Sequence, residues 1–245
     1  MMKTSTSRNA NQTKSIGNTI RVLLSIFVLL IATGFSVAQT TYTSTSTNTW
    51  STQVWSPAGT PGVNDHVVIN HNIQVNVNVA IKNLTVNAGR TLTISGNNFT
   101  AGGTTTVAGT LTDNNNLGAN VFTGLVTVNS GGSFNTANNS TYTFGGGILN
   151  AGTFSKTGTG AVAINNATNI GGPSAITMAG TIAINGNTAI TAGSTISWSS
   201  FVTVAAGASV NNSGTVHCTN ILNGANATTS IWNNLNGSVL NLSLI

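Results

Sequence analysis

Short segments in which one apolar residue stands between two polar residues recur along the chain. Examples are Thr91-Leu92-Thr93, Thr110-Leu111-Thr112 and Thr153-Phe154-Ser155. Because successive side chains of a β-strand point to opposite faces, the middle residue faces inward and its two neighbours face water. The pattern therefore predicts short strands that are buried on one side and hydrophilic on the other.

Each of these segments follows a glycine, and the glycines return at steps of 20 to 23 residues. They are Gly89, Gly109, Gly131, Gly152, Gly172, Gly193, Gly214 and Gly237. Self-similarity at a fixed period of this length is typical of stacked repeat architectures. We therefore expect an all-β fold, a right-handed parallel β-helix with about 21 residues per turn, over residues 62–245.

Stacking the turns predicts a continuous apolar column inside the coil. Its expected members are Leu92, Leu111, Phe134, Phe154, Ile196, Val216 and Val239. The turn at Gly172 is the poorest copy, because Pro173 follows the glycine and Ile176 shifts the apolar position. We expect a bulge or an altered corner there.

The positive charge of the chain is concentrated in its first residues. An apolar run, residues 22–32, follows four basic residues and precedes the small residues Ser36 and Ala38. This order is typical of a secretory signal peptide, here residues 1–38 with cleavage after Ala38. The alternative is a single membrane anchor, but the apolar run is shorter than the roughly 20 residues of a membrane span. We therefore expect a secreted or cell-surface protein with no stable membrane span after cleavage.

The remaining chain, from Gln39, carries almost no charge. It contains three basic residues and two acidic ones, Asp65 and Asp113, which gives a net charge of +1. A basic patch that could neutralise phosphates is absent from this sequence, so we do not expect nucleic-acid binding.

Candidate catalytic or metal-binding groups are few. The segment after residue 38 contains no Glu, and its two Asp residues are expected to be single solvated corner residues. Cys218 is the only cysteine, and the alternation points its side chain inward and His217 outward. His66 and His71 lie five residues apart, which places them on opposite faces of an unbroken strand and argues against a metal site. We expect no enzyme activity, cofactor or metal.

The segment 39–61 differs from the repeats. It is rich in Ser and Thr and contains Trp50 and Trp55. We expect this segment to cap the first coil, with the tryptophans as a hydrophobic plug, while a platform for stacking sugars is the alternative.

One stretch resembles a known group of proteins. Residues 55–69 read Trp-Ser-Pro-x-Gly-x-Pro-Gly-x-x-Asp-x-Val-x-Ile and lead into Asn83-Leu84-Thr85-Val86-Asn87-Ala88-Gly89. The chain from Trp50 onward is similar to the opening of secreted parallel β-helix proteins, which are adhesin-like bacterial surface proteins often exported by the type IX pathway. The resemblance implies a surface-exposed, mostly non-catalytic stalk or adhesive module. A polar terminal cap and a separate sorting domain are not visible in the sequence.

The last residues continue the apolar alternation to Ile245. Because an open solenoid end exposes apolar side chains and an unpaired strand edge, we expect a truncated piece of a longer solenoid, or a subunit that stacks end to end.

Three functions of different classes remain open. The first is a non-catalytic structural or adhesive module whose partner is an extracellular glycan or another surface protein. The second is a flat-face binder of ice or crystalline glycan, which would use the hydroxyl grid of Thr91, Thr93, Thr110 and Thr112, with Trp50 and Trp55 as further candidate glycan contacts. The third is the non-catalytic part of a larger carbohydrate-active β-helix enzyme.

Overall fold

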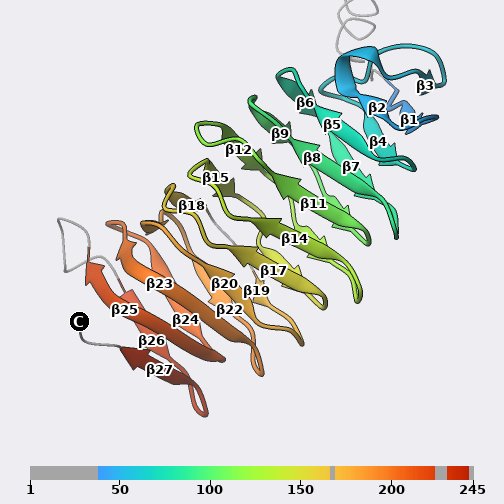
Figure 1. Cartoon of the computed structure of the whole chain (residues 1–245). Helices are drawn as coiled ribbons and strands as arrows, with labels where there is room; N and C mark the ends of the chain where they lie inside the picture. The colour runs from blue at the N-terminus through green and yellow to red at the C-terminus, as the bar shows by residue number, and fades with distance from the viewer. Residues whose placement is uncertain (1–37, 166–168, 224–230, 243–245) are drawn as a thin grey trace, which may run out of the picture. The chain divides into compact units, whose positions relative to one another are not determined.

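A coil of parallel strands forms the described part of the chain (Figure 1). The computed structural model describes residues 38–165, 169–223 and 231–242. The chain divides into two compact units between Ala38 and Gln39, and the coil belongs to the second unit. The expected signal peptide, residues 1–38, lies outside the described residues except for Ala38.

The strands form an all-β parallel solenoid of about nine turns with about 21 residues per turn, which confirms the predicted fold class and period. They pair in one sheet of 11 strands and one of 16. The larger sheet doubles back at β23, Thr195–Val204, whose first half pairs with β20 and second half with β21. The coil therefore has three faces. No helix among the described residues is long and apolar enough to cross a membrane.

The first face contains the strands of the smaller sheet. In chain order its parallel strands are β1 (Thr41–Ser44), β4 (His66–Ile69), β7 (Asn83–Val86), β10 (Thr105–Val107), β13 (Val126–Val128), β16 (Ile148–Asn150), β19 (Ile170–Gly171), β22 (Thr188–Ile190), β24 (Ser209–Asn212) and β26 (Ile231–Asn234), and the antiparallel strand β3 (Trp55–Ser56) completes the sheet beside β1.

The second face, which we call the hydroxyl face, begins with the short strand β2. Its strands are β2 (Asn48–Thr49), β5 (Ile73–Val75), β8 (Thr91–Ile94), β11 (Thr110–Asp113), β14 (Ser133–Thr136), β17 (Thr153–Lys156), β20 (Ile176–Met178), the first halves of β23 and β25 (Thr215–Asn223), and β27 (Val239–Leu242).

The third face completes each turn. Its strands are β6 (Val79–Ile81), β9 (Phe99–Ala101), β12 (Ala119–Phe122), β15 (Thr141–Phe144), β18 (Val162–Ile164), β21 (Ile182–Ile184) and the second halves of β23 and β25.

The predicted apolar column runs through the interior behind the hydroxyl face. Strand pairing aligns Leu92, Leu111, Phe134, Phe154, Ile176, Ile196, Val216 and Leu240 in register. The prediction of Val239 at the last position is wrong, because Val239 lies opposite Thr215 and is 43% exposed. The corner at Gly237 has a positive φ and uses one more residue before the strand, which moves Leu240 inward.

The expected irregularity at Gly172 is a changed corner. Gly171 and Gly172 both have positive φ, at 156° and 127°. The ladder itself is continuous there, because Phe154 pairs with Ile176 in the same register as its neighbours.

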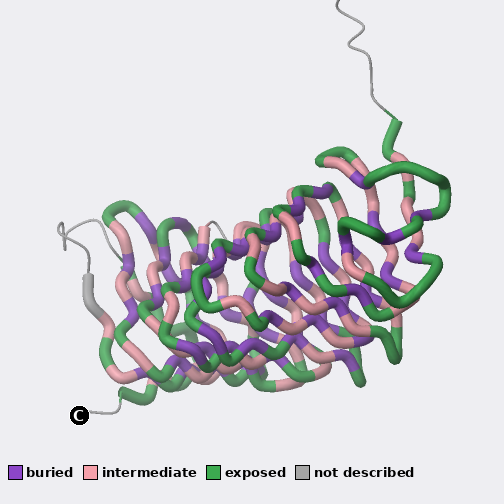
Figure 2. The backbone as a smooth tube through the Cα atoms, turned by 45° about the horizontal axis from the view of Figure 1, so that its top comes forward, coloured by how far each residue is buried: buried purple, intermediate pink, exposed green. Residues whose placement is uncertain are grey.

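Aromatic rings fill the interior of the middle turns. Phe134 and Phe154 stack with ring centroids 4.6 Å apart, and Phe122 lies edge-on to Phe134 at 5.6 Å. Figure 2 shows buried residues alternating with partly exposed ones along the strands of the coil. Burial of this column is the main source of stability, since the chain has one free cysteine and no disulfide among its described residues.

The N-terminal end of the coil is covered. β3 (Trp55–Ser56) pairs antiparallel with β1, and the 3-10 turn Trp50–Thr52 brings Trp50 against Trp55 and Phe99. The ladder of the first face therefore starts at Thr41, ahead of the boundary expected at residue 62. Asp65 supports this end, because its carboxylate accepts hydrogen bonds from the backbone N–H groups of Thr40 and Gly62.

Candidate binding face

The hydroxyl face carries two outward columns of polar side chains. The column nearer the start of each strand contains Thr91, Thr110, Ser133 and Thr153 in register. The other contains Gln74, Thr93, Thr112, Asn135, Ser155, Thr177, Ser197, His217 and Asn241. The grid predicted from Thr91, Thr93, Thr110 and Thr112 is thus present and extends beyond them.

The spacing of this grid follows from strand geometry. Neighbours within a column are about 4.8 Å apart, and the two columns are separated by two residues of strand, about 6.6 Å. The parallel ladder holds every position, so the hydroxyl and amide groups form a preorganised surface for hydrogen bonding. Such a surface is suited to an extended or repetitive ligand.

Charge is almost absent from the surface of the later turns. After Arg90 the sequence contains two charged side chains, Asp113 and Lys156. Both are buried, at 3% and 0% exposure. The expectation that Asp113 is a solvated corner residue is therefore wrong, because it continues the inward alternation of Leu111.

Asp113 is held by a network of polar groups inside the coil. Its carboxylate accepts hydrogen bonds from the backbone N–H of Asn115 (2.7 Å), the amide of Asn120 (2.7 Å) and the hydroxyl of Tyr142 (2.6 Å). Burial, and then the negative charge of Asp113, raise the pKa of Tyr142 well above its usual range. The carboxylate is thus committed to structural contacts and is not available as a solvent-exposed catalytic group.

Lys156 lies in the same inward column, two rungs beyond Asp113 with Thr136 between them. Its ammonium donates hydrogen bonds to the carbonyl oxygens of Gly158, Gly160 and Ala179. Burial lowers the pKa of Lys156 to about 8. This lysine ties a corner of its own turn to the next turn.

The Lys156 environment predicts that stability rises with pH. Between pH 8 and about 10.5 the unfolded chain holds a proton on Lys156 that the folded chain has released, so folding becomes more favourable as pH increases. The gain should be about 1–3 kcal/mol, since one pKa unit corresponds to about 1.4 kcal/mol. Denaturant titrations of the wild type and of Lys156→Met at pH 7.5, 8.5 and 9.5 measure it.

Comparing wild type with Lys156→Met isolates the contribution of Lys156 to the pH dependence of stability. Burial raises the pKa values of Cys218 and Tyr142, and both groups lower stability as pH rises. These contributions cancel in the difference between wild type and Lys156→Met. A difference that stays constant across this pH range would contradict the assignment.

Trp50 and Trp55 are inside the molecule. Their exposed fractions are 4% and 3%, and their ring centroids lie 4.9 Å apart. The structure places them as the plug of the first coil, with no ring face open to a sugar. Of the six candidate contact residues, only the four threonines lie on the outer surface.

The histidines do not come together. His66 hydrogen-bonds the hydroxyl of Thr85, and Nδ1 of His71 lies 2.8 Å from the carbonyl oxygen of Ser44. His217 is exposed and Cys218 is buried, as the alternation predicts. In the described ranges no three His, Cys, Asp or Glu side chains are grouped in a way that could hold a metal ion.

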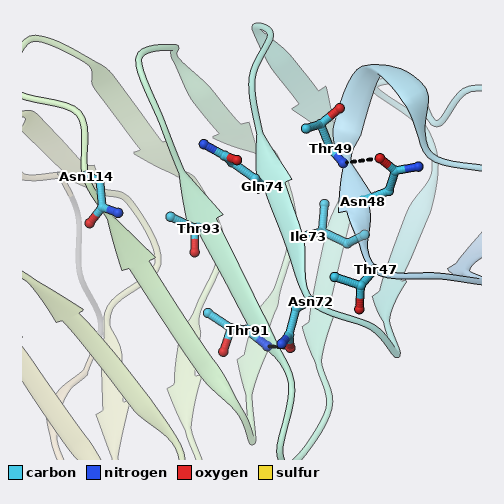
Figure 3. Close-up of a pocket in the computed structure, with 9 residues that line it drawn as sticks. All are labelled: Thr47, Asn48, Thr49, Asn72, Ile73, Gln74, Thr91, Thr93 and Asn114. Atoms are coloured by element: carbon cyan, nitrogen blue, oxygen red, sulfur yellow. Dashed lines mark hydrogen bonds between the residues drawn. The ribbon is translucent and has the colours of Figure 1, made fainter.

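An open hollow of about 540 Å³ lies at the N-terminal edge of the hydroxyl face (Figure 3). It extends across β2, β5, β8 and the corner after β11, and its lining is uncharged. The lining residues are Thr47, Asn48, Thr49, Asn72, Ile73, Gln74, Thr91, Thr93 and Asn114. Sequence reasoning found Thr91 and Thr93 from their alternation but missed the amides, which come from three different turns. No protein family, curated protein or solved structure matches this chain.

Proposed function

We infer that this protein is a non-catalytic structural or adhesive module that acts outside the cell or on its surface. The observation that carries the proposal is the long, regular, uncharged hydroxyl face on a coil held by continuous strand ladders. The two charged groups of the later turns are used inside the coil, in the Asp113 network and the Lys156 carbonyl cage. The predicted signal peptide supports export.

The resemblance to adhesin-like β-helix proteins supports the same reading and adds a bacterial origin and type IX export to the proposal. The extracellular partner would be a glycan or another surface protein. Hydrogen-bonding groups at fixed spacing suit either partner, because affinity would come from many weak contacts made together.

The test is retention of the full chain on solid surfaces. Purified protein is incubated with cellulose, chitin, mannan and immobilised matrix proteins, and bound protein is measured alongside release of soluble sugar. We expect retention on at least one surface with no sugar release. Retention on none of them, or release of sugar from a polysaccharide, would contradict the proposal.

A second candidate is supported by the two-column grid itself. A flat array of hydroxyl groups repeating at about 4.8 by 6.6 Å could match a crystal surface such as ice or crystalline glycan. Thermal hysteresis and partition into growing ice measure this directly. The interruptions at Asn135 and His217 favour the adhesive function over it.

A further inference from the structure

We propose that the hollow at the N-terminal edge of the hydroxyl face is a binding site for an uncharged, linear saccharide. This inference rests on the proposed function and specifies where and what the face binds. Its basis is a group of polar side chains that converge on one open space, several of which make no hydrogen bond to another described residue.

The hollow exists because the first rung of the face is incomplete. β2 contributes only Asn48 and Thr49 to the ladder, and the chain then turns into the core at Trp50. The next rung, β5, has three residues, so its last residue, Val75, has no partner in β2, and Gln74 lies in register with Thr49. Figure 3 shows Gln74 with Thr49 on one side and Thr93 and Asn114 on the other.

Four of the lining side chains are available to a ligand, whereas those of Asn48 and Thr49 are hydrogen-bonded to Thr52. Gln74 and Asn114 are exposed, and no hydrogen bond joins their side-chain amides to another described group. The Thr91 and Thr93 hydroxyls are likewise without a partner among the described residues. Asn72 is fixed, because its side-chain oxygen accepts the backbone N–H of Thr91. Two amides and two hydroxyls thus offer both donors and acceptors, which matches the hydroxyl groups of sugars.

The chemistry of the lining excludes other ligand classes. None of the lining residues is charged, so the site cannot attract phosphate, sulfate or carboxylate groups electrostatically. Its one large apolar residue, Ile73, is 2% exposed and offers no anchor for an apolar side chain or lipid. A neutral, hydroxyl-rich ligand is what remains.

The shape of the hollow favours a short linear chain. It crosses four consecutive turns, three steps of about 4.8 Å, or about 14 Å in all. This length holds about three sugar units in an extended chain. Because Trp50 and Trp55 are buried, no exposed ring adds stacking energy, and we expect modest affinity, with Kd between about 10 µM and 1 mM.

The test is calorimetric titration of the full chain with soluble linear hexasaccharides. The neutral probes are β-1,4-linked glucose, β-1,4-linked N-acetylglucosamine, β-1,4-linked mannose and α-1,4-linked glucose, and the anionic probe is a galacturonic acid hexasaccharide. The double variant Gln74→Ala/Asn114→Ala removes both free amides. The control, Thr106→Ala/Thr127→Ala, changes two outward threonines on neighbouring rungs of the first face, outside the candidate binding face.

We expect at least one neutral hexasaccharide to bind, the Gln74→Ala/Asn114→Ala variant to lose about tenfold in affinity, and the control to match wild type. Binding should change less than twofold between about 50 mM and 1 M NaCl, because no charge pairing is involved. Equal circular dichroism spectra and melting temperatures confirm that both variants fold.

Three outcomes would overturn the site: binding of no neutral probe, unchanged binding by Gln74→Ala/Asn114→Ala, or tighter, salt-sensitive binding of the anionic probe. If the full chain is still retained on a solid surface in these cases, the adhesive function stands and only the hollow is misassigned. Failure of retention on every surface would instead remove the proposed function.

Discussion

Replacing Phe134 by alanine is expected to lower the free energy of unfolding by about 3–5 kcal/mol, the range for deleting a buried aromatic ring. The Phe134 ring stacks on Phe154 and contacts the rings of Phe122, Tyr142 and Phe144. Its removal leaves a cavity in the middle of the column, because the neighbouring rings are fixed by their own strands. Denaturant unfolding followed by tryptophan fluorescence measures the loss.

The matched control is Ser133→Ala, one residue earlier in the same strand. Ser133 points outward, and no hydrogen bond of its side chain is present among the described residues. We expect a change within about 0.5 kcal/mol, as for most surface substitutions. Similar losses for Phe134→Ala and Ser133→Ala would contradict the inward and outward assignments.

Gly109→Ala should destabilise the protein as strongly as Phe134→Ala. We expect the free energy of unfolding to fall by about 3 kcal/mol or more, the upper end of the range for overpacking. A Cβ at Gly109 would lie 2.2 Å from the carbonyl oxygens of both Asn87 and Arg90 in the preceding turn. These are backbone atoms, so they cannot rotate away as a side chain would. The change in melting temperature and in the denaturant midpoint measures the effect.

Gly131→Ala provides the comparison at the same corner one turn later. Gly131 has a φ of +79°, and a Cβ there would meet no atom within 4 Å. Its cost is therefore only that of a left-handed conformation, about 1–2 kcal/mol. A larger destabilisation by Gly131→Ala than by Gly109→Ala would contradict the close approach of successive turns at Gly109.

The period of the coil and most of its interior could be predicted because both follow from local alternation. Leu111 and Phe134 each stand between polar neighbours after a glycine, and strand geometry then places them inward. The same alternation also places Asp113 and Lys156 inward, two residues after Leu111 and Phe154. The charge of Asp113 argued for solvent, but for both side chains hydrogen bonds from other turns replace the lost water.

The last inward residue and the hollow were not predicted from the sequence, and both depend on the corners and the edge of the coil. Whether Val239 or Leu240 faces inward depends on the φ of Gly237, which adds one residue to the corner. The hollow depends on where β2 stops, and its lining joins Asn48 to Asn114 over several turns. Neither feature is visible in a local pattern.

The most direct test of the account is the spacing of the rungs along the hydroxyl face. Pairs of nitroxide labels on cysteines, in a Cys218→Ala background, can join Thr93 to Ser155, Ser197 or Asn241, which lie three, five and seven rungs away. Electron–electron distance measurements should give about 14, 24 and 34 Å between the labelled backbones, an increase of about 4.8 Å for each rung. Distances that do not rise in this order, or that do not scale with the number of rungs, would contradict the stacked coil on which the proposed binding face depends.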